Sequence, residues 1–308
     1  MVLAPPPVAI PIRRGSRFFA ALQWWHLLSL DAPTVAALWS WSIARAMHIR
    51  LPWSAPLLLA LGTWLVYVAD RILDGLRIKS AAHLRERHFF YMRQRSKSLV
   101  ATVIVGLVLV WLVATRMTAA ARYEDMALFG IALAYFCLIH LCGPLCESLC
   151  ESGIERWFPK EMVVGVVFAA AVAVPAWSRL EGQRASMMPV VTLFALLCWL
   201  NCTAIEKWER SPPAATHLST TPLPHATTRW AQKHLSIVSC GVALLAAIAC
   251  VRSILSADPV AMSLIYLACM ISPILLLAFD RSRLESFHLR IAADAALLTP
   301  LLFVLGIR

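Results

Sequence analysis

The sequence predicts an all-α polytopic membrane protein with nine transmembrane helices, and three observations support this fold class. The chain of 308 residues is 60% hydrophobic and only 15% charged, far from the balance of a soluble domain. Its mean hydropathy is +0.72. The apolar residues gather in stretches that approach the ~20 residues an α-helix needs to cross ~30 Å of hydrocarbon. The apolar excess therefore indicates lipid-facing surface and excludes a water-soluble fold of this size.

A window of about 19 residues moved along the chain selects nine apolar stretches. From the N-terminus they are 33–49, 52–70, 98–115, 125–142, 162–177, 187–205, 234–251, 260–279 and 289–306. Each is continuously apolar, and the short fifth stretch can be extended backward to Pro159. The chain thus divides into a basic, Pro-rich N-terminal segment, 1–32, and a nine-helix transmembrane domain, 33–308.

The basic residues predict the orientation of these helices. One set of connections holds 20 Lys and Arg side chains, and the alternate set holds seven, with Arg45 inside the first stretch. Because cytoplasmic loops are rich in Lys and Arg, the N-terminus is predicted inside and the C-terminus outside. The cytoplasmic loops are 71–97, 143–161, 206–233 and 280–288. The net charge of +11 is therefore read as positive-inside topology in the cytoplasmic (inner) membrane, with the lipid bilayer as partner and no nucleic acid.

Two pairs of acids lie at the inner ends of the second and sixth stretches. Asp70 and Asp74 are four residues apart, and Glu206 and Glu209 are three apart, so each pair projects from one helix face. If the two faces converge, four bare carboxylates repel one another strongly, and a cation between them is required. Mg²⁺ is commonly held by carboxylates together with substrate phosphates. Taken alone, the first pair also fits a solvated helix end paired with Arg71.

Several basic residues on the same side suit a diphosphate. Arg71, Arg77 and Lys160 are candidate partners for its oxygens. Asp294 lies about one turn inside the ninth stretch, where a carboxylate is expected to have a partner such as Arg290 or Arg71, or to contact substrate. Asn201, inside the sixth stretch, is expected either to bond a neighbouring helix or to bind substrate.

These motifs resemble the UbiA superfamily of intramembrane prenyltransferases. The first family motif, N-D-x-x-D-x-x-x-D, falls on Val66 and Tyr67, followed by the two matching acids Asp70 and Asp74. The second motif falls on Glu206 and Glu209, with Asn201 where many members carry arginine. Lys160 matches a lysine that many members place near the diphosphate at the start of the fifth helix.

The resemblance implies a UbiA-like helical bundle, a catalytic and metal-binding set and a substrate-binding set. The first set is Asp70, Asp74, Glu206 and Glu209, holding two or fewer Mg²⁺ ions; the second is Arg71, Arg77, Lys160, Asn201, Tyr67 and Asp294. It also implies transfer of an isoprenyl group from a prenyl diphosphate to a lipid or aromatic acceptor, with Mg²⁺-dependent ionisation of the diphosphate. The implied partners are the prenyl diphosphate and a hydrophobic acceptor.

Two other readings of the same bundle remain. A non-catalytic homologue would bind lipid in the same cavity, and a membrane transporter would use that cavity for a lipid or an ion. Transporters tend to show inverted repeats and interrupted helices, and the lack of a convincing repeat in the sequence favours the enzyme. A structural membrane subunit is the third possibility, in which Asp70 is dispensable.

A cluster of His140, Cys142, Cys146 and Cys150 also has metal-ligating side chains. Zinc sites usually pair cysteines two to four residues apart across a turn, with four converging ligands. The four-residue spacing here favours a capped helix end over a metal site.

Overall fold

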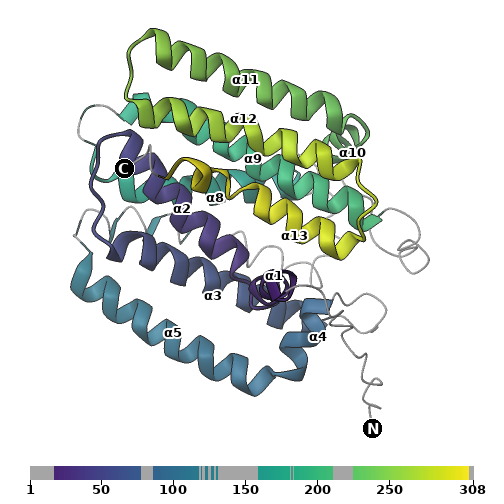
Figure 1. The fold of residues 1–308 in the computed structure, drawn as a ribbon. Helices are drawn as coiled ribbons and strands as arrows, with labels where there is room; N and C mark the ends of the chain where they lie inside the picture. The colour runs from purple at the N-terminus through teal and green to yellow at the C-terminus, as the bar shows by residue number, and fades with distance from the viewer. Residues whose placement is uncertain are drawn as a thin grey trace.

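The chain is an all-helical protein in the computed structural model, which describes residues 17–77, 86–117, 159–180, 184–210 and 225–304, with Gly182 and isolated positions between 117 and 159. The long helices run side by side, as Figure 1 shows. The elements are α1 (Arg17–Leu27), α2 (Asp31–Ala46), α3 (Ser54–Arg77), α4 (Glu86–Arg93), α5 (Arg95–Arg116), α8 (Lys160–Trp177), α9 (Arg184–Arg210), α10 (Ala226–Lys233), α11 (Leu235–Leu255), α12 (Val260–Asp280), α13 (Ser286–Ala296) and the 3-10 helix η6 (Thr299–Phe303).

Six of these helices are long and apolar enough to cross a membrane, counted over the described residues alone. They are α5, α8, α9, α11, α12 and the Ser54–Leu73 part of α3. They correspond to six of the predicted stretches, 52–70, 98–115, 162–177, 187–205, 234–251 and 260–279. The prediction of a helical, multi-pass membrane protein is therefore confirmed.

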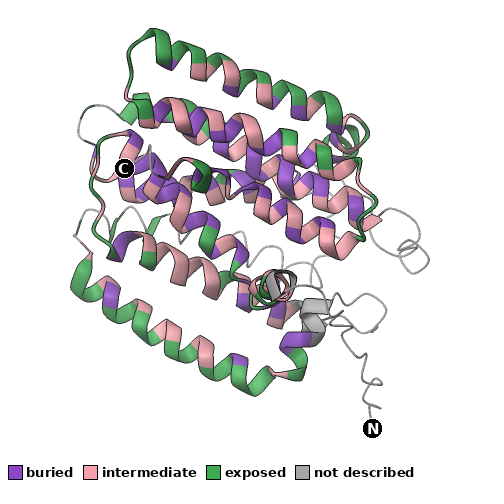
Figure 2. Cartoon of the chain, viewed as in Figure 1, coloured by how far each residue is buried: buried purple, intermediate pink, exposed green. Residues whose placement is uncertain are grey.

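The core of the bundle lies between α2, α8, α9 and α12. Trp39 of α2 and Phe194 of α9 are both fully buried, and their rings stack with centroids 4.3 Å apart. The outer helices α5 and α11 instead expose apolar side chains along most of their length, as Figure 2 shows. Leu107 and Ile254 are examples. Continuously apolar helices that expose this surface are suited to lipid contact.

Close packing of α8 on α9 depends on Gly165. A Cβ atom built on this glycine would lie 2.8 Å from the backbone nitrogen of Trp199 and 3.0 Å from the carbonyl oxygen of Ala195. Small residues let helix backbones approach closely inside membranes. The glycine thus sets the distance between two helices that both contribute residues to the candidate site.

The first predicted stretch, 33–49, corresponds to α2, which covers only Asp31–Ala46. The helix ends two residues before His48, which has a positive φ of 57°. Most of the fourth stretch, 125–142, and the cluster from His140 to Cys150 fall outside the described residues.

The ninth stretch, 289–306, is not the single helix that the sequence predicts. α13 ends at Ala296, and η6 begins after a two-residue turn. The cause is Pro300, because a proline ring clashes with the carbonyl four residues back and supplies no N–H group. That carbonyl, of Ala296, lies 2.8 Å from the Ser272 hydroxyl, and the Leu297 carbonyl accepts a hydrogen bond from Trp39. Neighbouring helices therefore satisfy the backbone at the break, as a membrane interior requires.

α1 lies across the ends of the other helices rather than among them. In Figure 1 it is seen nearly end-on, whereas α2, α3 and α13 run across the view. The turn from α1 to α2 passes through Ser29, a buried residue with a positive φ of 53°. The Tyr91 hydroxyl donates to Ser29 Oγ over 3.2 Å, and the Trp64 indole donates to the carbonyl of Leu28 over 3.0 Å. The predicted N-terminal segment 1–32 thus contains a helix, and hydrogen bonds join the turn that follows it to the bundle.

Candidate functional site

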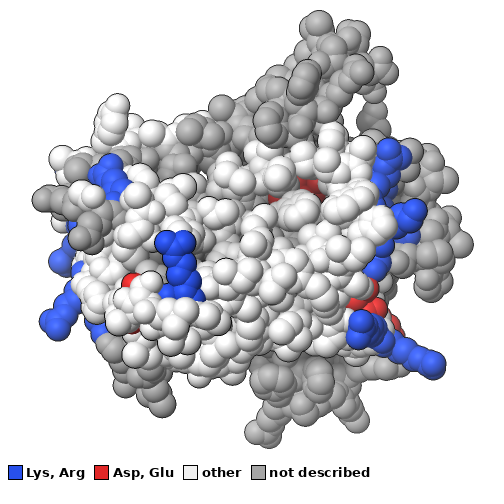
Figure 3. All heavy atoms as spheres, turned by 90° about the horizontal axis from the view of Figure 1, so that it is seen from above, with Lys and Arg blue, Asp and Glu red and all other residues white. Residues whose placement is uncertain are grey.

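The candidate site lies at one end of the bundle, which we call the charged end. The C-termini of α3, α9 and α12 and the N-termini of α2, α8 and α13 meet there (Figure 1). Among residues with described side chains it holds the carboxylates Asp31, Asp70, Glu161, Glu206, Glu209, Asp280, Glu285 and Asp294. Seen from above, the Lys and Arg side chains in view lie mainly toward the two ends of the molecule, and the surface between them is mostly uncharged (Figure 3). The predicted acids whose side chains are described, Asp70, Glu206 and Glu209, are thus all toward this end.

On α3, the carboxylate of Asp70 is paired with its neighbour in the chain. Arg71 Nη1 donates to Asp70 Oδ2 over 2.8 Å, and the Arg71 side chain is 7% exposed. The guanidinium carbon of Arg71 also lies 5.6 Å from the centre of the Tyr67 ring, in a cation–π contact. Within the described part of the chain, Arg71 Nε has no hydrogen-bond partner. Three predicted site residues therefore lie together at the C-terminal end of α3.

On α9, the two predicted acids each bond an arginine. Arg210 Nε donates to Glu206 Oε1 over 2.7 Å, one helical turn away. Glu209 forms an ion pair with Arg290 of α13, and both side chains are mostly buried. The structure does not bring Asp70, Glu206 and Glu209 into direct contact, because each carboxylate is bonded to a guanidinium. The side chains of Asp74 and Arg77 lie outside those described.

Lys160 is exposed at the first residue of α8, at the charged end. Next to it, Glu161 accepts a hydrogen bond of 2.8 Å from the Thr228 hydroxyl of α10. Cys202 of α9 is close enough to Lys160, Glu161 and Asp294 for electrostatic interaction with all three. The start of α8 is therefore part of the same polar region as α9 and α13.

The most buried part of the charged end is a cluster of four residues, His26, Asp31, Asn201 and Asp294, which we call the buried polar cluster. His26 Nδ1 lies 2.9 Å from Asp31 Oδ2 and 3.6 Å from Asp294 Oδ2. Asn201 Nδ2 donates to Asp294 Oδ1 over 3.2 Å. The side chains of His26, Asp31 and Asp294 are only 2%, 6% and 17% exposed. Four elements, α1, α2, α9 and α13, thus converge on one point.

Burial of the Asp31 carboxyl opposes its ionisation, but the hydrogen bond and attraction of His26 outweigh this effect. Together they hold the pKa of Asp31 well below its ordinary value. The backbone N–H of Ala32 adds a hydrogen bond of 2.9 Å to Asp31 Oδ1. Tyr67 of α3 is also within electrostatic reach of Asp31 and Asp294. The cluster and the C-terminal end of α3 are therefore close to each other.

The sequence pointed to Asn201, Asp294 and Tyr67 but not to His26 or Asp31. Asp294 was expected to have a partner such as Arg290 or Arg71, or to contact substrate. It accepts a hydrogen bond from Asn201, and Arg290 lies within electrostatic reach of it while forming its ion pair with Glu209. His26 and Asp31 fall in the segment 1–32 that the hydropathy pattern separates from the bundle. An acid at the start of an apolar stretch, with a histidine five residues before it, was the available signal.

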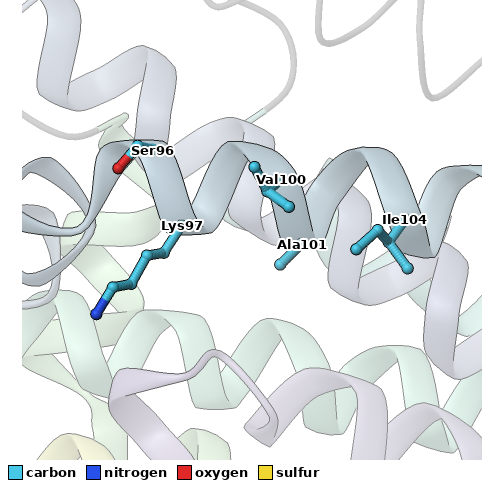
Figure 4. Close-up of a pocket in the computed structure, with 5 residues that line it drawn as sticks. All are labelled: Ser96, Lys97, Val100, Ala101 and Ile104. Carbon is cyan, nitrogen blue, oxygen red and sulfur yellow. The ribbon is translucent and has the colours of Figure 1, made fainter.

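A pocket on the outside of the bundle does not belong to this site. Ser96, Lys97, Val100, Ala101 and Ile104 line it, all on α5 (Figure 4). It opens on the apolar surface that α5 exposes, and a single helix supplies its walls. In comparisons with known proteins, no family model, no curated protein and no solved structure matches the chain.

Proposed function

We propose that the chain is a UbiA-like prenyltransferase that moves an isoprenyl group from a prenyl diphosphate to a lipid or aromatic acceptor. The observation that carries this proposal is that two acidic helix ends, of α3 and α9, lie at the same charged end of an apolar bundle. Basic side chains for a diphosphate stand beside both ends: Arg71 next to Asp70, and Arg290 bonded to Glu209. The apolar helices beyond them suit an isoprenyl chain.

Mg²⁺ is part of this proposal, and the donor chemistry suits it. Asp70, Glu206 and Glu209 supply carboxylate oxygens, the ligands that Mg²⁺ prefers. Each now bonds a guanidinium, so a metal would exchange places with an arginine, and that arginine would then be available to a diphosphate oxygen. When bound, Mg²⁺ neutralises charge that develops on the departing diphosphate.

The roles of the protein's own side chains follow from their positions. Arg71 and Arg290, both largely buried, bind and orient the diphosphate more strongly than solvent-exposed cations do, because electrostatic attraction grows as water is excluded. Lys160, exposed at the start of α8, attracts the diphosphate on its way in. Tyr67 orients Arg71 through its ring and separates the charged end from the apolar interior. The hydrophobic acceptor approaches from the lipid side.

We further propose nine spans with the charged end in the cytoplasm, in the cytoplasmic membrane. This orientation is supported by the basic residues of the described helices. At the charged end these are Arg71, Arg93, Arg95, Lys97, Lys160, Lys207, Arg210, Arg229, Lys233, Arg281, Arg283 and Arg290; at the opposite end they are Arg45, Arg50, Arg116, Arg179, Arg184 and Arg252. Such an excess is typical of the cytoplasmic side.

The test is Mg²⁺-dependent binding of non-hydrolysable isoprenyl thiodiphosphates of several chain lengths to the purified protein, which needs no acceptor. Binding is expected for wild type with Mg²⁺, and much less binding for Asp70→Asn and Glu206→Gln. A matched control is Glu285→Gln, because Glu285 is an exposed acid at the same end. If the folded wild-type protein binds no chain length, the prenyltransferase proposal is wrong.

One observation favours a transporter as the second candidate. The break between α13 and η6 interrupts a helix beside buried acids, a feature common in the binding sites of transporters. Flux of protons or cations into vesicles that contain the purified protein would support this reading. Mg²⁺-dependent thiodiphosphate binding without any flux would support the enzyme.

A further inference from the structure

The buried polar cluster contains ionisable side chains that have no role in the proposed prenyl transfer. His26, Asp31 and Asp294 come from α1, α2 and α13, and one ligand atom from each lies within 4.8 Å of the other two. Two carboxylates this close in a largely buried place repel each other unless a positive charge or a proton stands between them. In the described residues, Arg290 bonds Glu209 rather than either of these acids. Arg290 lies within electrostatic reach of both acids as well as of Glu209. When His26 is neutral, as a metal-ligating imidazole has to be, three carboxylates face this one guanidinium, and a divalent cation balances the remaining charge.

The hydrogen bonds around the cluster aim one oxygen of each acid at the same point. Asp31 Oδ1 accepts from the backbone N–H of Ala32, and Asp294 Oδ1 accepts from Asn201 Nδ2. The two remaining oxygens, both Oδ2, are the atoms that face His26 Nδ1, at 2.9 and 3.6 Å. Partners that hold the outer atoms of metal ligands are typical of metal sites, because they fix the orientation of the ligands.

These distances match those between ligands of a small divalent ion. Metal-to-ligand bonds of ~2.0–2.2 Å in tetrahedral geometry separate neighbouring ligand atoms by about 3.4 Å. The two measured separations, 2.9 and 3.6 Å, lie on either side of that value. The third separation, between the two carboxylate oxygens, is within 4.8 Å. Small side-chain shifts therefore allow the three atoms to contact one ion.

A fourth oxygen lies beside the three ligands without a partner. Asn201 is 5% exposed, and its Oδ1 atom has no hydrogen-bond partner among the residues that the structure describes. An amide oxygen buried in this way costs free energy unless something binds it. Because Nδ2 of the same amide bonds Asp294, the unpaired oxygen is held next to the cluster.

We propose that His26, Asp31 and Asp294 bind one divalent transition-metal ion, such as Zn²⁺, Co²⁺ or Mn²⁺, through Nδ1 and the two Oδ2 atoms. Imidazole favours these ions over Mg²⁺, whose ligands are oxygen atoms. The site is separate from the proposed Mg²⁺ ligands Asp70, Glu206 and Glu209. Asn201 is a positioning residue for Asp294. The ion ties α1 to the bundle core.

The test uses the full chain, purified in detergent and treated with chelator, and Co²⁺ as the probe, with no diphosphate present. Equilibrium dialysis is expected to give one tightly bound ion per chain, and the visible spectrum to report coordination by nitrogen and oxygen. Asp31→Asn and Asp294→Asn are expected to weaken binding by more than about tenfold, and Asn201→Leu by about 10- to 100-fold.

Two controls separate this site from other causes. Asp280→Asn changes an acid at the same end that instead bonds Lys207 and Trp208, and it is expected to retain the ion. Asp70→Asn is also expected to retain it, so failure of the prenyltransferase proposal is distinguishable from failure of this one. The proposal is overturned if folded wild-type protein binds no Co²⁺ ion tightly, or if Asp294→Asn binds it as tightly as wild type.

A measurement on the wild-type protein keeps the test decisive if the variants do not fold. Pulsed electron paramagnetic resonance of bound Mn²⁺ detects coupling to a coordinating imidazole nitrogen. Such coupling, lost in the milder variant His26→Gln, supports the site. Tightly bound Mn²⁺ with no nitrogen coupling overturns it.

Discussion

The indole nitrogen of Trp39 donates a hydrogen bond of 2.7 Å to the backbone carbonyl oxygen of Leu297. This bond joins the middle of α2 to the turn at which α13 ends. A free carbonyl in an apolar interior costs several kcal/mol, so the bond determines where the last helix of the bundle can break. It also couples the core stack of Trp39 on Phe194 to the helix that carries Asp294.

We expect Trp39→Phe to lower the free energy of unfolding by about 1–3 kcal/mol, because it keeps an aromatic ring but leaves the Leu297 carbonyl unpaired in the core. Chemical unfolding in detergent micelles measures the loss. Trp111→Phe, on the exposed face of α5, is the matched control and should change stability little. Equal stability of the two variants would contradict the role of the hydrogen bond.

Gly165→Ala should destabilise the protein by about 1–3 kcal/mol, because the added methyl group would meet the backbone of α9 and overpack the interface. Gly241→Ala on α11 is the control, since nothing lies within 4 Å of the position that its added methyl group would take. Alanine is a better helix former than glycine, by about 0.5–1 kcal/mol, so the control should be neutral or stabilising. Thermal unfolding of the two variants side by side gives the comparison.

Asp280→Ala should cost about 1–3 kcal/mol, because Asp280 accepts from the buried indole N–H of Trp208 over 2.7 Å as well as from Lys207. Asp280→Asn retains an oxygen for the indole and should lose distinctly less. The unfolding midpoint in denaturant reports both. A loss of the same size in the two variants would show that the ion pair, and not the indole bond, carries the energy.

Lys160→Gln should weaken binding of an isoprenyl thiodiphosphate about tenfold, equal to about 1.4 kcal/mol, if the proposed function is right. Lys97→Gln is the control, because Lys97 is also exposed at the charged end but lies on the outer helix α5. Isothermal titration with Mg²⁺ present compares them. Equal weakening in both would indicate general attraction by the charged end rather than a contact from Lys160.

Hydropathy alone was sufficient to predict the six long helices, because a lipid-facing helix has to be apolar along its whole length. The stretch 289–306 shows where the same signal fails. Apolar composition says that the segment is buried, but Pro300 decides whether it is one helix, and the outcome depends on Ser272 and Trp39 being in place to satisfy the freed carbonyls. Such tertiary partners are not visible in a local pattern.

The candidate site was predictable only where its acids lie on long helices. Asp70, Glu206 and Glu209 were singled out by their spacing, and pairing of Asp70 with Arg71 was one of the two expectations for it. The arginine partners of Glu206 and Glu209 depend on side-chain geometry. His26 and Asp31 were missed because they flank the turn at Ser29, where a positive φ turns the chain back onto the bundle. Nothing in the apolar periodicity marks that reversal of the chain. Only the reversal places His26 and Asp31 beside Asp294 and its partner Asn201.

The long sequence separation within the buried polar cluster has a consequence for biogenesis. During synthesis His26 and Asp31 can pair with each other at once, since they are neighbours in the chain. Asp294, and the Leu297 carbonyl that Trp39 bonds, arrive only when nearly the whole chain has been made. Until then, Asp31 and the indole N–H of Trp39 on α2 lack these partners. A chain cut short before α13 would keep these two polar groups without their partners from α13 and the turn after it. Unpaired polar groups of this kind are a feature by which membrane proteases and chaperones can distinguish an incomplete chain from a complete one.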